Sequence, residues 1–179
     1  MANAASTDPS PQIRLYLDLP FKAGLLIEPS PAQCHYLLTV MRQPPGGTVA
    51  LFNGTDGEWR ATIEPAGRRS CRLALQDQIR PQRPEPGPTL LFAPLKRMRQ
   101  EMLVEKATEL GVSRLQPVFC LRSVVDRVSS ARLFGIAAEA AEQCGRLTVP
   151  AIDAPLPLGE CLEGRAEGRP LYLGDETRT

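Results

Sequence analysis

The chain has 179 residues, of which 42% are hydrophobic and 23% are charged, so it can build a packed core and is not a disordered chain. Its 21 Lys and Arg residues balance 20 Asp and Glu residues, which excludes a strong overall positive field that would attract nucleic acid. Binding of a polyanion would therefore depend on local clusters of basic residues.

The cysteine pattern and the N-terminus exclude several other classes. The five cysteines are odd in number, widely spaced and without a C-x-x-C pair, which argues against a disulfide framework and against a zinc site. Residues 1–12 lack the basic and apolar regions of a signal peptide, and no segment approaches the roughly 18 apolar residues of a membrane span. We expect a cytoplasmic protein without a membrane or metal partner, whose residues 1–12 form a disordered tail.

Residues 13–80 alternate apolar and polar residues in the way that is typical of β-strands. The segments IRLYLDL, TVALF, EWRATI and SCRLALQ predict four short strands, and NGTDG at 53–57 supplies the turn residues that a hairpin requires. One helix interrupts these strands, with Ser30 as N-cap and Pro31 as its first residue, and it is expected to run to Pro44. This order predicts a small closed β-barrel.

The segment PQRPEPGP at 81–88 predicts a linker, because four prolines and a glycine cannot continue a helix or a central strand. Beyond it, TLLFAPL and RLQPVF predict two strands, joined by a helix over MRQEMLVEKATEL that ends at Gly111. A second helix begins at Ser129 or Ser130, followed by a weaker helix over LGECLE and a short strand, PLYLG. Residues 89–179 thus predict an α/β domain with a parallel sheet.

This predicted sheet is incomplete, because the chain ends directly after its last strand, before another crossover helix and strand. We expect further chain to follow Thr179 in the natural protein.

The familiar catalytic motifs are absent from the sequence. Neither G-x-G-x-x-G nor G-x-x-x-x-G-K-[ST] occurs, so nucleotide binding by these loops is not expected. His35 is the only histidine, and no G-x-S-x-G motif supplies a nucleophile for it. The residue pattern by itself favours a partly buried helix histidine.

Basic residues follow both strands of the predicted α/β unit. The segment LKRMR places Lys96, Arg97 and Arg99 at the carboxyl end of the first strand, and Arg122 follows the second. Open α/β sheets bind ligands in the crevice at this edge. The cations could hold phosphate there or form an ordinary solvated turn, and Arg122 favours the phosphate site.

Lys106 lies among apolar residues of the first predicted α/β helix, beside Leu103, Ala107 and Leu110 at helical spacing. Burying an unpaired ammonium costs several kcal/mol. Lys106 is therefore expected either to pair with Glu109, one turn on, or to contact a polyanionic ligand.

The segment EAAEQCGRLTVP at 139–150 ends the second predicted helix with a polar cluster. Glu142 and Gln143 share a face opposite the alanines, and Gly145 is expected to end the helix in the left-handed conformation. Arg146 is then free to leave the helical register. Cys144 falls on the apolar stripe and is expected to be a buried, unreactive thiol.

Three segments together resemble a known family. HYLLTVMRQPPGG, MLVEKATELGVSRLQPVFCLRSVV and AAEAAEQCGRLTVP, in this order, are similar to the RsmE family of 16S ribosomal RNA uridine N3-methyltransferases. The resemblance implies a PUA-like RNA-binding barrel, a SPOUT domain with a C-terminal knot, S-adenosylmethionine as cofactor, 16S rRNA of the small ribosomal subunit as partner, and a homodimer.

The resemblance also implies a set of site residues, which it makes RNA-facing or domain-organising and none of which it makes a catalytic base. These positions are Arg14, His35, Arg42, Lys96, Arg97, Lys106, Glu109, Arg122, Glu142, Gln143 and Arg146.

The sequence departs from the family in one respect. Members carry a glycine-rich loop of the GPEGG type and a knot that binds the methyl donor, and neither occurs here, so we expect no cofactor site in this chain. Two other functions remain open. The chain could be a non-catalytic PUA-type RNA-binding module with an α/β dimerisation platform, or a small-molecule α/β enzyme with a pocket of Lys96, Lys106 and Arg122.

Overall fold

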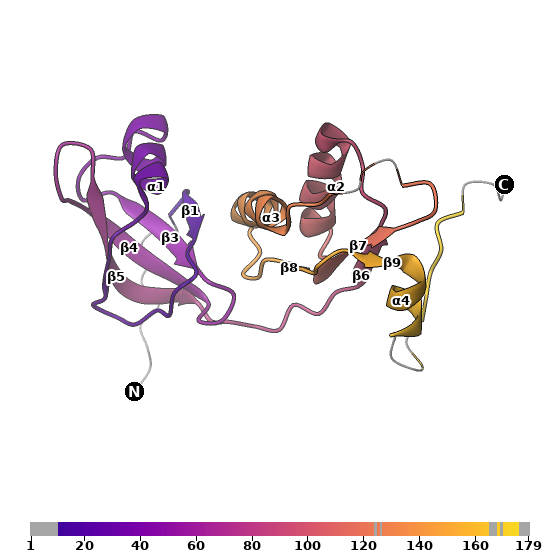
Figure 1. Ribbon diagram of the computed structural model, residues 1–179. Coiled ribbons are helices and arrows are strands. Elements are labelled where there is room, and N and C mark those ends of the chain that lie inside the picture. The colour runs from indigo at the N-terminus through magenta and orange to yellow at the C-terminus, as the bar shows by residue number, and fades with distance from the viewer. Residues whose placement is uncertain (1–10, 124, 126, 165–167, 169, 176–179) are drawn as a thin grey trace.

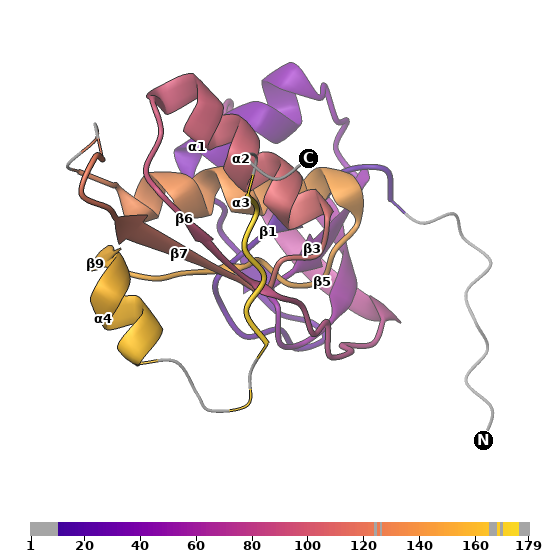
Figure 2. The same ribbon diagram turned by 90° about the vertical axis from the view of Figure 1, so that its right-hand side faces the viewer.

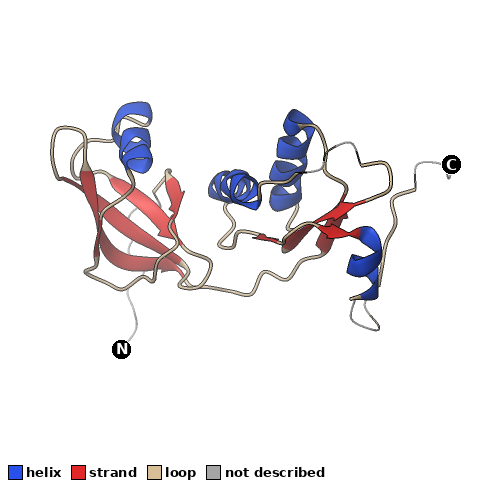
Figure 3. Cartoon of the chain, viewed as in Figure 1, coloured by secondary structure: helices blue, strands red, loops and turns tan. Residues whose placement is uncertain are grey.

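The structure is a computed structural model, and it describes residues 11–123, 125, 127–164, 168 and 170–175. The predicted N-terminal tail lies almost wholly outside the described residues. The described chain forms two sheets, each with its own helices, joined by an extended segment (Figures 1 and 3). The predicted mixed α/β class, with a β-rich N-terminal domain and a parallel sheet after it, is confirmed.

Five strands form the N-terminal sheet in the order β1-β3-β4-β5-β2. Their bounds are Arg14–Tyr16 for β1, Leu26–Ile27 for β2, Thr48–Phe52 for β3, Glu58–Pro65 for β4 and Cys71–Arg80 for β5. The pairing of β1 with β3 is parallel and the other pairings are antiparallel. All five strands contribute to one buried core, so the alternation in the sequence marks the inward side chains correctly.

The predicted turn at 53–57 joins β3 to β4 and is held by its own side chains. The Asn53 side-chain oxygen accepts from the backbone N–H groups of Thr55 and Asp56 at 2.9 and 2.7 Å. Gly57 has a φ of +75°, and a Cβ there would lie 2.3 Å from the backbone oxygen of Arg80. The glycine is therefore required by both the turn and the close approach of the chain after β5.

One helical segment covers this sheet and consists of α1, Pro31–His35, and a wider π-helical turn, η1, Tyr36–Val40. Ser30 and Gln33 form a reciprocal capping box, which confirms the predicted start. The helix ends at Val40, before the predicted Pro44, because the chain turns at Arg42, which has a φ of +50°.

The second sheet is parallel and contains β6, Thr89–Phe92, β7, Arg114–Phe119, and β8, Ala151–Ile152, with β9, Leu156–Pro157, also pairing with β7. The predicted helices are present as α2, Arg97–Glu109, α3, Ser130–Cys144, and α4, Leu158–Glu163. Figures 1 and 2 show α2 and α3 on one side of the sheet and α4 on the other.

One predicted strand is wrong. The segment PLYLG, residues 170–174, is not a strand, and the third strand of the sheet is β8. Residues 171–173 are exposed, so their apolar character does not reflect burial in the sheet. The strand β8 has only two residues, which is too short to give a periodic signal.

The segment 81–88 contains no helix or strand, but hydrogen bonds tie it to both sheets. The Gln82 side chain accepts from the N–H of Gly57 at 3.1 Å, and the Ser113 hydroxyl donates to the oxygen of Gly87 at 2.7 Å. A Cβ on Gly87 would lie 2.0 Å from the oxygen of Gly111, so only glycine fits there. The segment is a bound strap.

Candidate functional site

The carboxyl end of α3 lies against the N-terminal domain, where Arg14 binds its free carbonyls. The guanidinium of Arg14 donates to the backbone oxygens of Ala141, Glu142 and Arg146 at 2.7, 2.9 and 2.7 Å. The last carbonyls of a helix lack internal partners and carry its partial negative charge. A cation of the first domain therefore caps a helix of the second.

A buried carboxylate holds Arg14 in this position. Glu58, whose side chain is 7% exposed, accepts from Arg14 Nε at 2.5 Å and from Arg80 Nε at 2.7 Å. Arg80 also donates to the oxygen of Gly145 at 2.8 Å. Arg14 lies over the ring of Phe52, 4.4 Å from its centroid. The carboxylate of Glu58 thus pairs with two arginines, and both arginines donate to backbone oxygens at the carboxyl end of α3.

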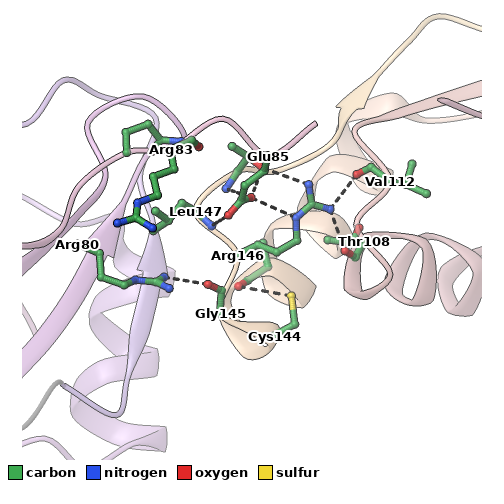
Figure 4. Close-up of polar contacts among 12 residues, drawn as sticks. Arg80, Arg83, Glu85, Thr108, Val112, Cys144, Gly145, Arg146 and Leu147 are labelled. Carbon is green, nitrogen blue, oxygen red and sulfur yellow. Dashed lines mark hydrogen bonds and ion pairs between the residues drawn. The ribbon is translucent and has the colours of Figure 1, made fainter. Parts of the chain in front are cut away.

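Arg146 leaves the axis of α3, as predicted, because Gly145 has a φ of +82°. Its Nη1 donates to the oxygens of Thr108 and Val112, both at 2.8 Å, at the end of α2 (Figure 4). Its Nε lies 3.5 Å from Oε2 of Glu85 in the strap, and its side chain is only 10% exposed. Arg146 therefore joins α3, α2 and the strap, and its side chain points into the protein.

Glu85 completes this connection by binding the chain that follows α3. Its carboxylate accepts from the backbone N–H groups of Leu147 and Thr148, both at 3.2 Å, and from the Thr148 hydroxyl at 2.6 Å. Burial by itself would raise the pKa of Glu85, but these hydrogen bonds and the charge of Arg146 outweigh it, so the pKa lies below its ordinary value.

Glu142 contacts the N-terminal domain from α3. Its Oε1 accepts from the N–H of Tyr16 at 2.9 Å. Burial, and then the charge of Glu139, raise its pKa above the ordinary value against the opposing effects of Tyr16 and Arg14.

Apolar contacts accompany these polar ones. The ring of Tyr16 meets those of Phe52 and Phe134 edge-on, at centroid distances of 5.7 and 5.5 Å. Phe52, Ala141 and Leu147 form a small buried cluster between the domains. We call the contacts of Arg14, Glu58, Arg80, Glu142 and Arg146 with their partners the interdomain seam.

The basic residues at the carboxyl edge of the second sheet are exposed, as a phosphate-binding surface requires. Lys96 directly precedes α2, and Arg122 follows β7. Arg97 pairs with Glu101 at 3.1 Å, and Glu101 also binds Arg132 of α3. The hydrogen bonds from Arg132 and Arg97 lower the pKa of Glu101.

Two predicted site residues lie on or just after the helical segment of the first domain. His35 and Arg42 are both exposed, so the prediction of a partly buried histidine is wrong. His35 is the last residue of α1, and its side chain lies on the side that does not face the core.

The prediction that Lys106 lies on an apolar face is also wrong. The residues that α2 buries are Val104, Ala107 and Thr108, whereas Leu110 is 83% exposed. Lys106 is exposed and donates to both Glu105 and Glu109 at 2.9 Å, and these hydrogen bonds raise its pKa. The predicted ion pair of Lys106 with Glu109 is present.

The structure also places Gln143 and Cys144 at the surface. The prediction of a buried Cys144 is wrong because α3 ends at this residue, so its side chain lies beyond the core-facing turns.

Lys106 does not converge with Lys96 and Arg122, since ten residues of helix separate it from Lys96 by about 15 Å. A hollow of about 860 Å³ lies elsewhere, between β6, β7 and α4. Its described lining includes Leu90, Gln116 and Cys161 and none of the predicted site residues. The small-molecule pocket of Lys96, Lys106 and Arg122 is therefore not formed.

Three residues of the seam and the strap were not found from the sequence: Glu58, Arg80 and Glu85. Glu58 and Arg80 are cross-strand partners in β4 and β5, but an alternating strand does not reveal which acid is buried. Glu85 lies between two prolines, where an acidic residue is expected to be exposed to solvent. The only sequence signal for its role is that an acidic residue occurs within a proline-rich segment.

Comparison with known proteins supplies the family. A family model described as the RNA methyltransferase domain matches residues 83–179, more than half of the chain, and one described as the RNA methyltransferase PUA domain matches residues 30–76. The ribosomal RNA small subunit methyltransferase E of Rickettsia conorii is 30% identical over 151 residues, which are 84% of this chain and 62% of that protein. The chain belongs to the RsmE family of RNA methyltransferases. The Synechocystis protein of the same name is 32% identical over 82% of this chain and 49% of its own length.

Solved structures agree with the RsmE fold. A Legionella pneumophila methyltransferase, solved with the bound cofactor SAM, has a TM-score of 0.75 and 26% identity, covering 87% of this chain and 67% of that one. An RsmE protein of Neisseria gonorrhoeae bound to S-adenosyl methionine has a TM-score of 0.75 and 23% identity, covering 87% and 66%. The chain spans 62% and 49% of the two curated relatives.

No helix among the described residues is long and apolar enough to cross a membrane. Within the same residues, no group of three or more His, Cys, Asp and Glu side chains could hold a metal ion.

Proposed function

We propose that the protein acts in S-adenosylmethionine-dependent methylation of ribosomal RNA of the small subunit, and that this chain contributes the binding and alignment of that RNA. The observation that carries the proposal is the succession of a PUA domain and an RNA methyltransferase domain in one chain, joined by the interdomain seam. The names of the two curated relatives support the choice of small-subunit rRNA.

The exposed cations support the RNA-binding part. Arg42 follows η1 in the first domain, and Lys96 and Arg97 stand at the start of α2 in the second. Both views in Figures 1 and 2 show the α1–η1 segment and α2 on the same side of the molecule. Because the chain has a net charge of only +1, phosphate binding depends on such a local surface.

The residues present do not form a fitting site for S-adenosylmethionine. In the RsmE resemblance this cofactor belongs to a glycine-rich loop, whereas the loops after β6 and β7, within the described part of the chain, contain no glycine. We therefore assign no residue of this chain to the methyl donor and derive no step through it.

On the family resemblance, we propose N3 of a uridine in 16S rRNA as the methylated atom. This atom carries a proton and lies on the base-pairing edge, so the uridine must be unpaired before it can react. Residues that grip the neighbouring phosphates would hold it in that state. The same resemblance supports a cytoplasmic homodimer that acts on the small ribosomal subunit.

The test of the proposed function is a gene deletion in the source organism, followed by nuclease digestion of its 16S rRNA and mass spectrometry of the nucleosides. We expect one 3-methyluridine to disappear and to return on complementation. A 3-methyluridine content equal to that of the parent strain would contradict the methylation, and would favour the non-catalytic RNA-binding module.

A further inference from the structure

We propose that Glu58 is a positioning residue, which fixes the PUA domain relative to the methyltransferase domain so that cations of both domains meet one RNA. The part of this inference that concerns RNA rests on the proposed function. The part that concerns the domains rests on the seam alone.

The carboxylate of Glu58 is the point at which two bridges between the domains meet. Each of its oxygens binds one arginine, Oε1 that of Arg14 and Oε2 that of Arg80. Both guanidinium groups then reach into the second domain and donate to four backbone oxygens at the end of α3, those of Ala141, Glu142, Gly145 and Arg146.

These contacts stabilise the junction between the domains more than they stabilise the sheet that contains Glu58. The backbone pairing of β4 with β3 and β5 already holds that sheet together. The apolar contact between the domains is small, centred on Phe52, Ala141 and Leu147. Domains joined by a small interface usually move relative to each other. A buried charge network of fixed geometry removes that freedom, because an arginine fork binds its partners in defined directions.

The strap limits the remaining motion. It is bound to the first domain through Gln82, to the chain after α3 through Glu85, and to Ser113 through Gly87. Because both ends of the strap are held, the motion that remains is a rotation of one domain against the other about the seam. The two arginines bound to Glu58 oppose this rotation.

The consequence for RNA follows from the positions of the exposed cations. The helical segment just before Arg42 and the helix α2 just after Lys96 belong to different domains but lie on the same side of the molecule (Figures 1 and 2). Two surfaces held at a fixed distance bind one RNA with a higher effective concentration than two surfaces that move independently. Loosening the seam should therefore weaken RNA binding although no RNA-contacting cation is removed.

The experiment compares Glu58→Gln with the unchanged 179-residue chain. The substitution keeps the shape of the side chain and removes the charge that holds both arginines. Residual dipolar couplings report whether the two domains share one alignment tensor, and equilibrium titration reports the affinity for 16S rRNA transcribed in vitro. Arg80→Met is the second variant, since Arg80 is 44% exposed and its replacement leaves no buried void. Glu28→Gln is the matched control, because it breaks the exposed pair of Glu28 with Arg72 in the same domain.

We expect the couplings within each domain of Glu58→Gln to fit the unchanged folds, while the tensors of the two domains diverge. Affinity for rRNA should fall at least about tenfold. The dependence of affinity on salt should keep its slope, because the number of phosphate contacts is the same. Arg80→Met should show the same pattern to a smaller extent, and Glu28→Gln should show neither change.

A single shared tensor in both Glu58→Gln and Arg80→Met would overturn the inference. So would diverging tensors with an unchanged affinity for rRNA. If the unchanged chain fails to bind rRNA, the proposed function and the RNA part of the inference fail together, and the couplings still decide whether Glu58 fixes the domains.

Discussion

The guanidinium of Arg14 donates to the backbone oxygen of Arg146 at 2.7 Å, so an arginine of the N-terminal sheet binds the residue whose own side chain holds α2 and the strap. Arg14 donates to the last carbonyls of α3, whereas Arg146 donates to the carbonyls of Thr108 and Val112 at the end of α2. Because the last carbonyls of a helix have no partner within the helix, the end of α3 depends on an arginine of the other domain and the end of α2 depends on Arg146.

Replacing Arg14 by Met should lower the free energy of unfolding by about 3 kcal/mol, because it removes one partner of a buried ion pair and leaves two carbonyls of α3 and that of Arg146 without their donor. Urea unfolding monitored by circular dichroism measures the change. Replacing Arg72, whose pair with Glu28 is exposed, should cost no more than about 1 kcal/mol. Equal losses for the two variants would show that Arg14 is not a structural residue of the seam.

Glu142→Gln should change how stability depends on pH. The folded pKa of Glu142 lies above its ordinary value, so between the unfolded and the folded pKa the folded chain binds more protons. This carboxyl therefore makes stability fall as the pH rises through that window. The glutamine can still accept from Tyr16.

The measurement is the stability difference between Glu142→Gln and the unchanged chain, from about pH 4 upward, where a free glutamate begins to ionise. As the pH rises, the free energy of unfolding of Glu142→Gln should increase relative to that of the unchanged chain. Above the folded pKa of Glu142 the difference should become constant. A difference that is independent of pH, or that shrinks as the pH rises, would contradict a raised pKa for Glu142.

Gly87→Ala and Gly135→Ala should have opposite effects. A Cβ at position 87 meets the oxygen of Gly111 at 2.0 Å, and relieving such a clash should cost about 1–3 kcal/mol. A Cβ at position 135, in the middle of α3, meets nothing within 4 Å, so alanine should stabilise the helix by about 0.5–1 kcal/mol. Thermal unfolding of the two variants measures both effects. If Gly87→Ala left the stability unchanged, the strap would not be held against the turn between α2 and β7.

Four of the five cysteines should react in two groups. Cys120 and Cys144 are exposed, whereas Cys34 and Cys71 are buried with their sulfurs 3.7 Å apart. Burial, together with the neighbouring Cys34, raises the pKa of Cys71 to about 11, which leaves little reactive thiolate at neutral pH. Timed alkylation with peptide mass mapping should label Cys120 and Cys144 first, and early labelling of Cys71 would contradict the packing of α1 on β5.

Local signals in the sequence mark several helix ends. Ser30 and Pro31 mark the start of α1, and Gly111 and Gly145 mark the ends of α2 and α3, because caps depend on backbone geometry that few residues can adopt. The strand β8 cannot be predicted, because two residues are too short to show a period. The apolar residues of PLYLG predict a strand wrongly, because they are exposed.

The seam was beyond sequence reasoning because its partners are distant along the chain. Arg14 binds Glu58 across 44 residues and Arg146 across 132. No local pattern distinguishes Glu58 from an exposed strand glutamate. The RsmE resemblance named Arg14, Glu142 and Arg146, and the structure supplied what these residues contact. For Lys106 and Cys144 the local pattern is misleading. Helical spacing predicts that both are buried, but both side chains are exposed to solvent.

The most direct test of the account is the binding of in vitro transcribed 16S rRNA by this chain over a series of salt concentrations. We compare Arg122→Ala, at the carboxyl edge of the second sheet, with Arg114→Ala, which removes the same charge at the opposite end of β7. The account predicts that affinity falls steeply with salt, that Arg122→Ala reduces the slope of log affinity against log salt by about 0.7 to 0.9, and that Arg114→Ala leaves it unchanged. Binding that is insensitive to salt, or equal effects of the two substitutions, would contradict it.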